Sequence, residues 1–570
     1  MLNHEVPHKT SAEVLNGNSQ IASYFAAVDN SVDIGDTNKR YQPINNTSYG
    51  PPPPIHGSTF TTLIISPTAD NTADIYNGYI NAEMELTVKL NDATITKWSD
   101  TDKYTFTATE GEPNGTDVNI KRSLSNPHKV WIGFKDAMNA IEKYEIMANG
   151  ISIYTQNNAI EESFITSCSL PESAKRGNTF SIARHKDVFD HKWGCGCGRY
   201  VDFSSGSEQT ITIPLKIDLR RFLPLSNVKY LPAFAGKIEL RVLFGVQGLV
   251  VAPVNPISCF IEPYAVSQFV IPEITCEFTP IGESFKMITK YTSPTYSGMT
   301  KDSKNRAYPV TKYGELTQTK VSVNAVMKQI NKCESVINCF GIASDVYDEM
   351  VMHYSQTPLT FPTQTITVIP FSNLVNKVND STSVTITPRF IDSIFLLFPY
   401  KQSYKSCYKN PMLSGFQLQC GGYGAIPSIM HPTFNDPNSI EELQNALNVN
   451  SDLVCLNKAV MKSMIDTTDD YSKDDINSDG LKSNDTSNFL IGLPTETDNT
   501  FQQGQTSNTP ITYTLTYNQN SSNYYTNAEI SPVMALLVDS TFSIQIRPDG
   551  APPICEIGSY DITSPLIISS

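Results

Sequence analysis

The chain has 570 residues, a formal net charge of −15 at pH 7, and only 17% charged residues. This acidic balance argues against a protein that binds nucleic acid through its phosphates, and the longest apolar runs are far too short to cross a membrane as a helix. The N-terminus MLNHEVPHKT has no apolar core of a secretory signal, so we expect a soluble protein. Abundant Asn, Thr, Ser and Tyr favour strands joined by long polar loops.

The eleven cysteines are an odd number, and most stand in apolar, strand-like surroundings. Buried thiols of this kind are typical of a reducing compartment, so we expect the chain to be made inside a cell. Cys333 and Cys339 either form a pair or simply pack in a core.

Residues 1–57 read as an N-terminal arm. They are polar, show no clear periodicity, and end in the stiff spacer Pro51–Pro54. Such a segment cannot bury a core of its own. It is either a disordered tail or an arm that becomes ordered against neighbouring subunits or an inner layer.

A first β series begins near Ser58. The segment 59–66 is β-branched and apolar, and strict alternation then marks one buried strand face, formed by Ile80, Ala82, Met84, Leu86, Val88 and Leu90. Residues 135–143 fit a short helix. The segment 145–154 fits a hairpin that turns at Asn149-Gly150, because both residues tolerate the positive φ of a type I′ turn.

Residues 156–209 are polar and too long for a simple turn, so we expect an elaborated outer loop or a small excursion of the chain. The most informative stretch follows at 211–244. Its two ends alternate, with Ile211, Ile213, Leu215, Ile217 and Leu219 on one face at the start and Ile238, Leu240, Val242 and Phe244 on one face at the end. The connection is too short for a crossover helix, which indicates antiparallel strands with one wet face. A further strand is expected at 269–278, closing the series near Pro280.

Residues 281–306 read as a linker, and a second β series follows. It is marked by YPVTKYGE at 308–315, by the valines 321, 323 and 326, and by strand patterns at 365–371, 383–387, 392–398, 511–517, 532–538 and 542–546. Ser439 and Glu442 form a capping-box pattern before a helix whose Ile440, Leu443 and Leu447 share a face.

The predicted fold is therefore all-β: two consecutive antiparallel eight-stranded jelly rolls with long loop insertions and few short helices. The predicted ranges are 1–57 for the arm, 58–280 for the first jelly roll, 281–306 for the linker and 307–570 for the second jelly roll. The sequence shows no repeat between the halves, so this division rests on the layout of the strands.

Several segments resemble the double jelly-roll major capsid proteins of polinton-like viruses, virophages and related DNA viruses. They are ITIPLKIDLRRFLPLSNVKYLPAFAGKIELRVLF, ADIYNGYINAEMELTVKL, DAMNAIEKYEIMANGISIYTQN, NPMLSGFQLQCGGYGAIPSIMHPTFNDPNSIEELQNALN and ISPVMALLVDSTFSIQI, in the expected order. The resemblance implies a pseudo-hexameric homotrimer that tiles an icosahedral shell, with the long loops outermost. It also implies a virion location after synthesis in the host cell interior, with penton and minor capsid proteins as partners.

Two segments carry residues of metal-ligand type. The first segment surrounds the sequence GCGCG and has four residues of a type that binds zinc: His185, His191, Cys195 and Cys197. However, a C-x-C spacing would strain a tetrahedral site that both cysteines share. The alternative is a glycine-rich bend with incidental thiols.

The second segment, DINSDG, contains Asp475, Asn477, Asp479 and Gly480 in the order of the first half of a calcium loop. Thr486 stands at the twelfth position, where a bidentate acid is required, and Asp485 comes one place early. The alternative is an exposed acidic loop. The prediction names no metal or cofactor for either segment.

Catalytic motifs are not found: the sequence has no phosphate-binding loop, zincin helix or nucleophile elbow. We therefore predict a non-enzymatic capsid subunit without catalytic or cofactor-binding residues. Two alternatives stay open. One is a carbohydrate-binding β-sandwich protein or glycosidase, suggested by the abundant Tyr, Asn and Asp; the other is a minor capsid or spike component.

Overall fold

The computed structural model describes most of the strand-forming segments of the chain. The described residues are 39–41, 60–67, 71–91, 105–111, 117–124, 129–170, 182–183, 188, 197–203, 207–254, 257–262, 278–291, 296–301, 307–311, 316–341, 344–371, 379–386, 391–401, 404–408, 413–420, 425–430, 437–447, 487–494, 511–519, 532–547 and 549–559. Every strand pair within them runs antiparallel. The prediction of an all-β chain with two antiparallel β units and few short helices is confirmed.

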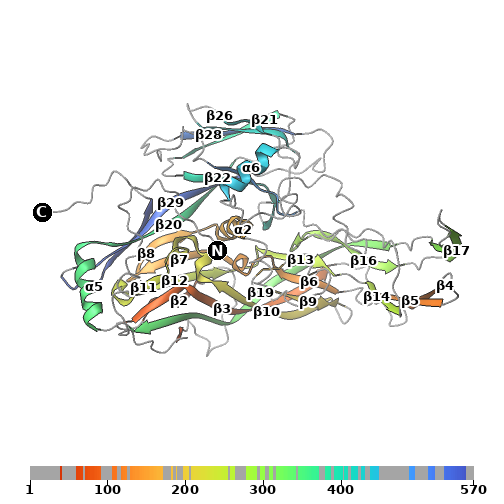
Figure 1. Cartoon of the computed structure of the whole chain (residues 1–570), viewed down its shortest axis with the longest axis horizontal. Coiled ribbons are helices and arrows are strands. Elements are labelled where there is room, and N and C mark those ends of the chain that lie inside the picture. Colours follow the sequence, from red (N-terminus) through yellow and green to blue (C-terminus); the bar gives the residue numbers. More distant parts are fainter. Residues whose placement is uncertain are drawn as a thin grey trace.

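The first β unit consists of three sheets around one apolar core (Figure 1). The long sheet has the order β1-β19-β3-β10, with bounds Lys39–Tyr41, Leu316–Gly341, Asn71–Asn91 and Glu208–Asp218, and β11 (Tyr230–Pro232) and β16 (Ser284–Tyr291) attach to it. The hairpin sheet has the order β2-β12-β7-β8, with bounds Thr61–Ile64, Ile238–Phe244, Ile141–Ala148 and Ile151–Gln156. The third sheet has the order β15-β13-β6-β9, with bounds Thr279–Pro280, Leu249–Pro253, Lys129–Phe134 and Gly198–Asp202.

Two smaller sheets lie at one end of the molecule, on the right of Figure 1. One has the order β14-β5-β4, with bounds Ile257–Glu262, Asp117–Leu124 and Thr105–Gly111. The other pairs β17 (Tyr296–Lys301) with β18 (Ala307–Thr311). These strands extend the first β unit away from its core.

The second β unit has two larger sheets and a small ribbon. One sheet has the order β20-β29-β22-β27, with β30 paired to β29; its bounds are Leu359–Pro370, Val533–Gln545, Ile391–Leu397, Ile491–Pro494 and Ile554–Ser559. The other has the order β21-β28-β25-β26, with bounds Asn379–Ile386, Ile511–Gln519, Leu413–Cys420 and Ala425–Met430. The ribbon pairs β23 (Pro399–Lys401) with β24 (Tyr404–Tyr408). In Figure 1 the β21-β28 sheet lies uppermost, and β20 and β29 run down to the first β unit.

The strands β20 and β29 contribute side chains to more than one apolar core. At one end, Phe361 and Phe542 stack with ring centroids 6.0 Å apart inside the core of the first β unit. At the other end, Ile366 and Leu537 pack in a separate cluster between the two units. A pair of strands this long therefore ties the units together along its whole length.

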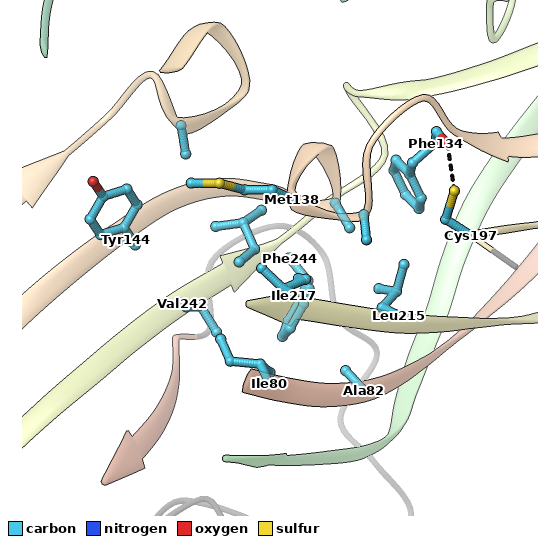
Figure 2. Close-up of a cluster of buried hydrophobic side chains, with 14 of the residues drawn as sticks. Ile80, Ala82, Phe134, Met138, Tyr144, Cys197, Leu215, Ile217, Val242 and Phe244 are labelled. Carbon is cyan, nitrogen blue, oxygen red and sulfur yellow. Dashed lines mark hydrogen bonds between the residues drawn. The ribbon is translucent and has the colours of Figure 1, made fainter. Parts of the chain in front are cut away.

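The alternation predicted for residues 80–90 is confirmed, since all six apolar side chains are buried along β3. On β10, Ile213, Leu215 and Ile217 are buried while Lys216 is exposed. Figure 2 shows how Ile80, Ala82, Leu215, Ile217, Val242 and Phe244 meet from three strands. The alternating patterns thus form the core of the first β unit.

The hairpin turn is also confirmed. Asn149 has a φ of 51° and Gly150 a φ of 85°, and β7 pairs with β8 on either side of them. The Asn149 side chain accepts a hydrogen bond from the Lys237 backbone at 2.9 Å and donates one to the Pro553 carbonyl at 3.1 Å. The turn therefore also joins the hairpin sheet to the segment that leads into β30.

Four local predictions need correction. Residues 135–143 contain only the 3₁₀ turn η2 (Ala137–Ala140), which begins after its N-cap Asp136 and ends at Ile141, where the backbone becomes extended and enters β7. Residues 156–209 include the buried helix α2 (Ala159–Cys168) and strand β9, so this part of the segment is not the outer loop that was one of its two expected forms. The helix α6 (Pro437–Ala446) begins two residues before Ser439, with proline at its first position, so Ser439 lies inside it and is not its cap. The wet face expected for β12 is largely covered, as Glu239 is only 7% exposed.

The sheets do not divide at the predicted linker. Residues 281–306 contain β16 and β17, and β19 beyond them pairs with β3 along almost its full length. Residues 39–41 of the predicted arm form β1, which pairs with β19 at Ser335–Ile337. The strand predicted at 269–278 lies outside the described residues except for Phe278.

Candidate functional site

Only one of the four predicted zinc ligands can be placed. Cys197 is fully buried beside β9, and its Sγ donates to the Phe134 carbonyl at 3.0 Å (Figure 2). His185, His191 and Cys195 lie outside the described residues, as do Asp475, Asn477, Asp479 and Gly480. Neither metal prediction is therefore tested.

Within the described ranges, no group of three or more His, Cys, Asp or Glu side chains could hold a metal ion. None of the helices described there is long and apolar enough to cross a membrane. Cys333 and Cys339 are both buried thiols and do not form a disulfide with each other. Of the two options for these cysteines, packing is the one observed.

The most distinctive feature of the described structure is the junction between the two β units. We define the junction as α2, the apolar cluster around it, and the polar contacts that α2 makes. The apolar cluster draws side chains from both units: Phe164, Ile165, Cys168, Leu223, Ile366, Phe395, Leu397, Tyr408, Leu443, Ala446, Leu447, Leu490, Ala535 and Leu537. Burial of this set holds the units in one arrangement.

Helix α2 is buried on nearly every side. Its first turn carries Glu161 and Glu162, which the partial positive charge of a helix N-terminus favours. A helix that is buried on all sides has no polar face, so its sequence lacks the alternation of polar and apolar residues that predicts a surface helix. The only available signal was apolar spacing, with Ile160 four residues before Phe164.

Glu162 is the polar centre of the junction and is fully buried. The Tyr144 hydroxyl lies 2.9 and 2.8 Å from its two carboxylate oxygens. The Gln156 amide donates to it at 3.1 Å and the Leu223 backbone N–H at 2.9 Å. We call these four residues the Glu162 cluster; they come from α2, β7, β8 and the 3₁₀ turn η5 (Leu223–Leu225).

Burial raises the pKa of Glu162 to about 7, against the opposing effect of its hydrogen-bond donors and of Arg221. Burial also raises the pKa of Tyr144 and of Tyr154 well above the ordinary range, and the nearby Glu162 adds to both shifts. The two tyrosines are therefore neutral donors or acceptors at all relevant pH values. Glu162 is the group of this cluster that changes charge near neutrality.

The Glu162 cluster reaches the second β unit through two bridges. The Gln156 amide that donates to Glu162 also donates to the Ile366 carbonyl of β20 at 3.1 Å. The Thr363 hydroxyl of β20 donates to the Leu223 carbonyl at 2.8 Å, on the same residue whose N–H donates to Glu162. The position of β20 is thus coupled to the hydrogen bonds of Glu162.

Ion pairs surround the cluster. Arg221, at the end of the 3₁₀ turn η4 (Leu219–Arg221), pairs with Asp136 and donates to the Ser163 carbonyl at 3.3 Å. Lys405 on β24 pairs with Glu161 at 3.2 Å. Burial raises the pKa of Glu161, and Lys405 opposes that shift.

A second cross-unit contact lies beside the third sheet. Lys135 is buried, and its ammonium donates to the Ser487 carbonyl at 3.1 Å, to the Ser487 hydroxyl, and to the Asn488 side chain at 3.0 Å. It also lies 5.7 Å from the centre of the Phe278 ring. The ammonium group of Lys135 therefore joins the segment before η2 to the segment that leads into β27.

Large apolar side chains are exposed at a few described positions: Ile151 at 69%, Met352 at 63%, Val326 at 57% and Ile554 at 43%. Ile151 follows the hairpin turn, and the Asn149 side chain in that turn binds the carbonyl of Pro553, the residue before Ile554. Exposed apolar side chains of this size are candidates for contact with other chains.

No family model matches the sequence, and no curated protein does either. Among solved structures, the chain is similar to a chain of the Sputnik virophage, with a TM-score of 0.49 and 9% identity over 95% of this chain and 93% of that one. It is similar to the major capsid protein of mavirus, with a TM-score of 0.47 and 10% identity over 95% and 94%. For the Faustovirus major capsid protein the TM-score is 0.39, with 9% identity over 88% and 89%. The mavirus and Faustovirus chains are described as major capsid proteins, and all three chains are 10% identical to this one or less.

Proposed function

We propose that this chain is the major capsid protein of a DNA virus, and that it works by forming pseudo-hexameric homotrimers that tile an icosahedral shell. The observation that carries the proposal is the buried junction, which makes two antiparallel β units into one block. A trimer of a subunit with two β units contains six β units. Six units match the pseudo-hexameric homotrimer that the sequence resemblance implies. Each unit is proposed to be a jelly roll.

The sheets suggest where one unit ends and the next begins. Because β16 and β19 pair within the long sheet, the first unit is proposed to run from residue 58 through Gly341, and the second from α5 (Ser344–Gln356) to the end of β30. The arm is proposed to be part of the first unit at β1, with its remaining residues available for contacts in the shell.

The function proposed is assembly without catalysis. The polar clusters described in this chain, those of Lys135 and Glu162, make contacts between the two β units. Association would be driven by burial of apolar surface at subunit contacts, with weaker polar contacts between trimers. Penton and minor capsid proteins are the proposed further partners, and the virion, after synthesis in the host cell, is the proposed location.

The test is the assembly state of the purified full chain. Analytical ultracentrifugation should give a species of three times the monomer mass, 63.1 kDa per chain, and negative-stain microscopy should show hexagonal particles or closed shells. A protein that stays monomeric at high concentration would contradict the proposal. Binding to an oligosaccharide array that is lost on replacing a single Asp or Glu would favour the carbohydrate-binding alternative.

A further inference from the structure

We propose that the junction responds to pH through Glu162, which holds a proton while the two β units are docked and gives it up as the pH rises past neutrality. The docked arrangement is then tighter in mildly acidic solution than in mildly alkaline solution. This property belongs to a single chain and does not depend on the proposed assembly.

Every element packed against Glu162 contributes known groups. Strands β7 and β8 present the hydroxyls of Tyr144 and Tyr154 and the amide of Gln156, all neutral. The turn η5 and strand β20 contribute backbone groups of Leu223 and Ile366.

Three charged side chains described near Glu162 are Arg221, Glu161 and Lys405. Arg221 on η4 attracts the Glu162 carboxylate but is already paired with Asp136 and with the Ser163 carbonyl. Glu161, the neighbour on α2, is paired with Lys405 of β24. Among the described residues, Glu162 thus has polar donors around it and the attraction of Arg221, but it forms no ion pair of its own. An ionised carboxylate without a directly paired cation is costly in a fully buried site.

The direction of the effect follows from the burial. The pKa of Glu162 is about 7 in the folded chain and 4.5 in the reference state. A carboxyl whose folded pKa is raised adds stability at and below the unfolded value, and that stability is lost as the pH rises from 4.5 to about 7. Above pH 7 the buried carboxylate is ionised and the contribution is gone.

The hydrogen bonds also indicate which contact weakens when Glu162 is ionised. Gln156 and Leu223 each bond to Glu162 on one side and to β20 on the other. A charged Glu162 attracts its donors more strongly than a neutral one, so the Gln156 amide is drawn toward it and away from the Ile366 carbonyl, which the same nitrogen also binds. Strand β20 is therefore the element expected to separate first from α2.

The first experiment compares urea unfolding of the full chain with that of Glu162→Gln at pH 5 and pH 8. The amide mimics the protonated carboxyl and cannot ionise. Relative to the variant, the wild type should lose on the order of a hundredfold in its folding equilibrium constant between the two pH values. Glu556→Gln, which removes an exposed carboxylate of β30, should leave the wild-type pH dependence in place. Parallel pH profiles for wild type and Glu162→Gln would overturn the proposal.

A second measurement does not require the Gln variant to fold. Infrared spectroscopy of the folded wild type should show a protonated carboxylic acid band at pH 6 that declines by pH 8. The variant Glu161→Gln should keep that band, because it removes the neighbouring carboxyl and leaves Glu162. Absence of the band at pH 6, or its loss in Glu161→Gln, would also overturn the proposal.

Discussion

The Tyr144 hydroxyl bridges both carboxylate oxygens of Glu162, at 2.9 and 2.8 Å, and neither residue is exposed to solvent. This contact joins the hairpin sheet to the helix on which the second β unit rests. Tyr144 also packs edge-on against Phe222, with ring centroids 4.9 Å apart. One tyrosine thus serves the apolar core through its ring and the polar junction through its hydroxyl.

Replacing Tyr144 by Phe keeps the ring packing and removes only the hydroxyl. We expect a loss of about 2 kcal/mol in the free energy of unfolding, because a buried carboxyl loses a donor. The loss should be larger at pH 8 than at pH 5, since the hydrogen bond is stronger when Glu162 is ionised. Urea unfolding at both pH values measures this.

The matched control is Tyr200→Phe, which removes a hydroxyl that donates to a backbone carbonyl, that of Val188, at 3.1 Å. Its cost should be about 1 kcal/mol and the same at both pH values. Equal pH profiles for the two variants would show that Glu162 does not change charge in this range.

Strand positions in the first β unit could be predicted because their patterns are local. The alternation along β3 and the Asn149-Gly150 turn each depend on neighbouring residues only, and both are found as predicted. The pairing of β19 with β3 could not be predicted in this way. It joins segments more than 200 residues apart, and alternation does not specify a partner.

The junction was missed for a related reason. Helix α2 is buried on nearly every side, so its sequence lacks the polar-apolar contrast that reveals surface helices. Glu161 and Glu162 lie in a segment of polar composition, and the fold buries both. Their function depends on residues from β7, β24 and η5, which only the tertiary structure brings together.

Gly198 tests the interpretation of the GCGCG segment. A Cβ at this position would lie 2.2 Å from Cζ2 of Trp131, a fully buried ring, so the glycine is required by packing. Gly198→Ala should lower the free energy of unfolding by about 3 kcal/mol or more. Gly558→Ala, at a strand position where a Cβ meets nothing within 4 Å, should change it by less than about 0.5 kcal/mol. Thermal and urea unfolding provide the comparison, and equal stabilities would contradict this account.

Lys135 provides a test of the second cross-unit contact. Lys135→Met keeps the length of the side chain but removes the donors to Ser487 and Asn488, and should cost about 2 kcal/mol. Hydrogen exchange should become faster at residues 487–490, while the hairpin sheet keeps its protection. The exposed Lys143 of β7 supplies the control, because Lys143→Met removes a charge with little burial. If exchange rises equally in both units, Lys135 stabilises the fold as a whole and not this contact in particular.

Ile151 tests the assembly proposal at a described surface. Its side chain is 69% exposed, so Ile151→Glu should leave the stability of the single chain within about 0.5 kcal/mol of wild type. If the surface around Ile151 contacts another copy of the chain, a carboxylate buried in that contact should weaken association by tenfold or more, which is about 1.4 kcal/mol. Sedimentation velocity across a concentration series measures the change. Asn324→Glu, at an exposed polar position of β19, is the control and should associate as the wild type does. If Ile151→Glu associates as the wild type does, the surface around Ile151 is not part of the subunit contact, and the proposed trimer has to be tested at other surfaces.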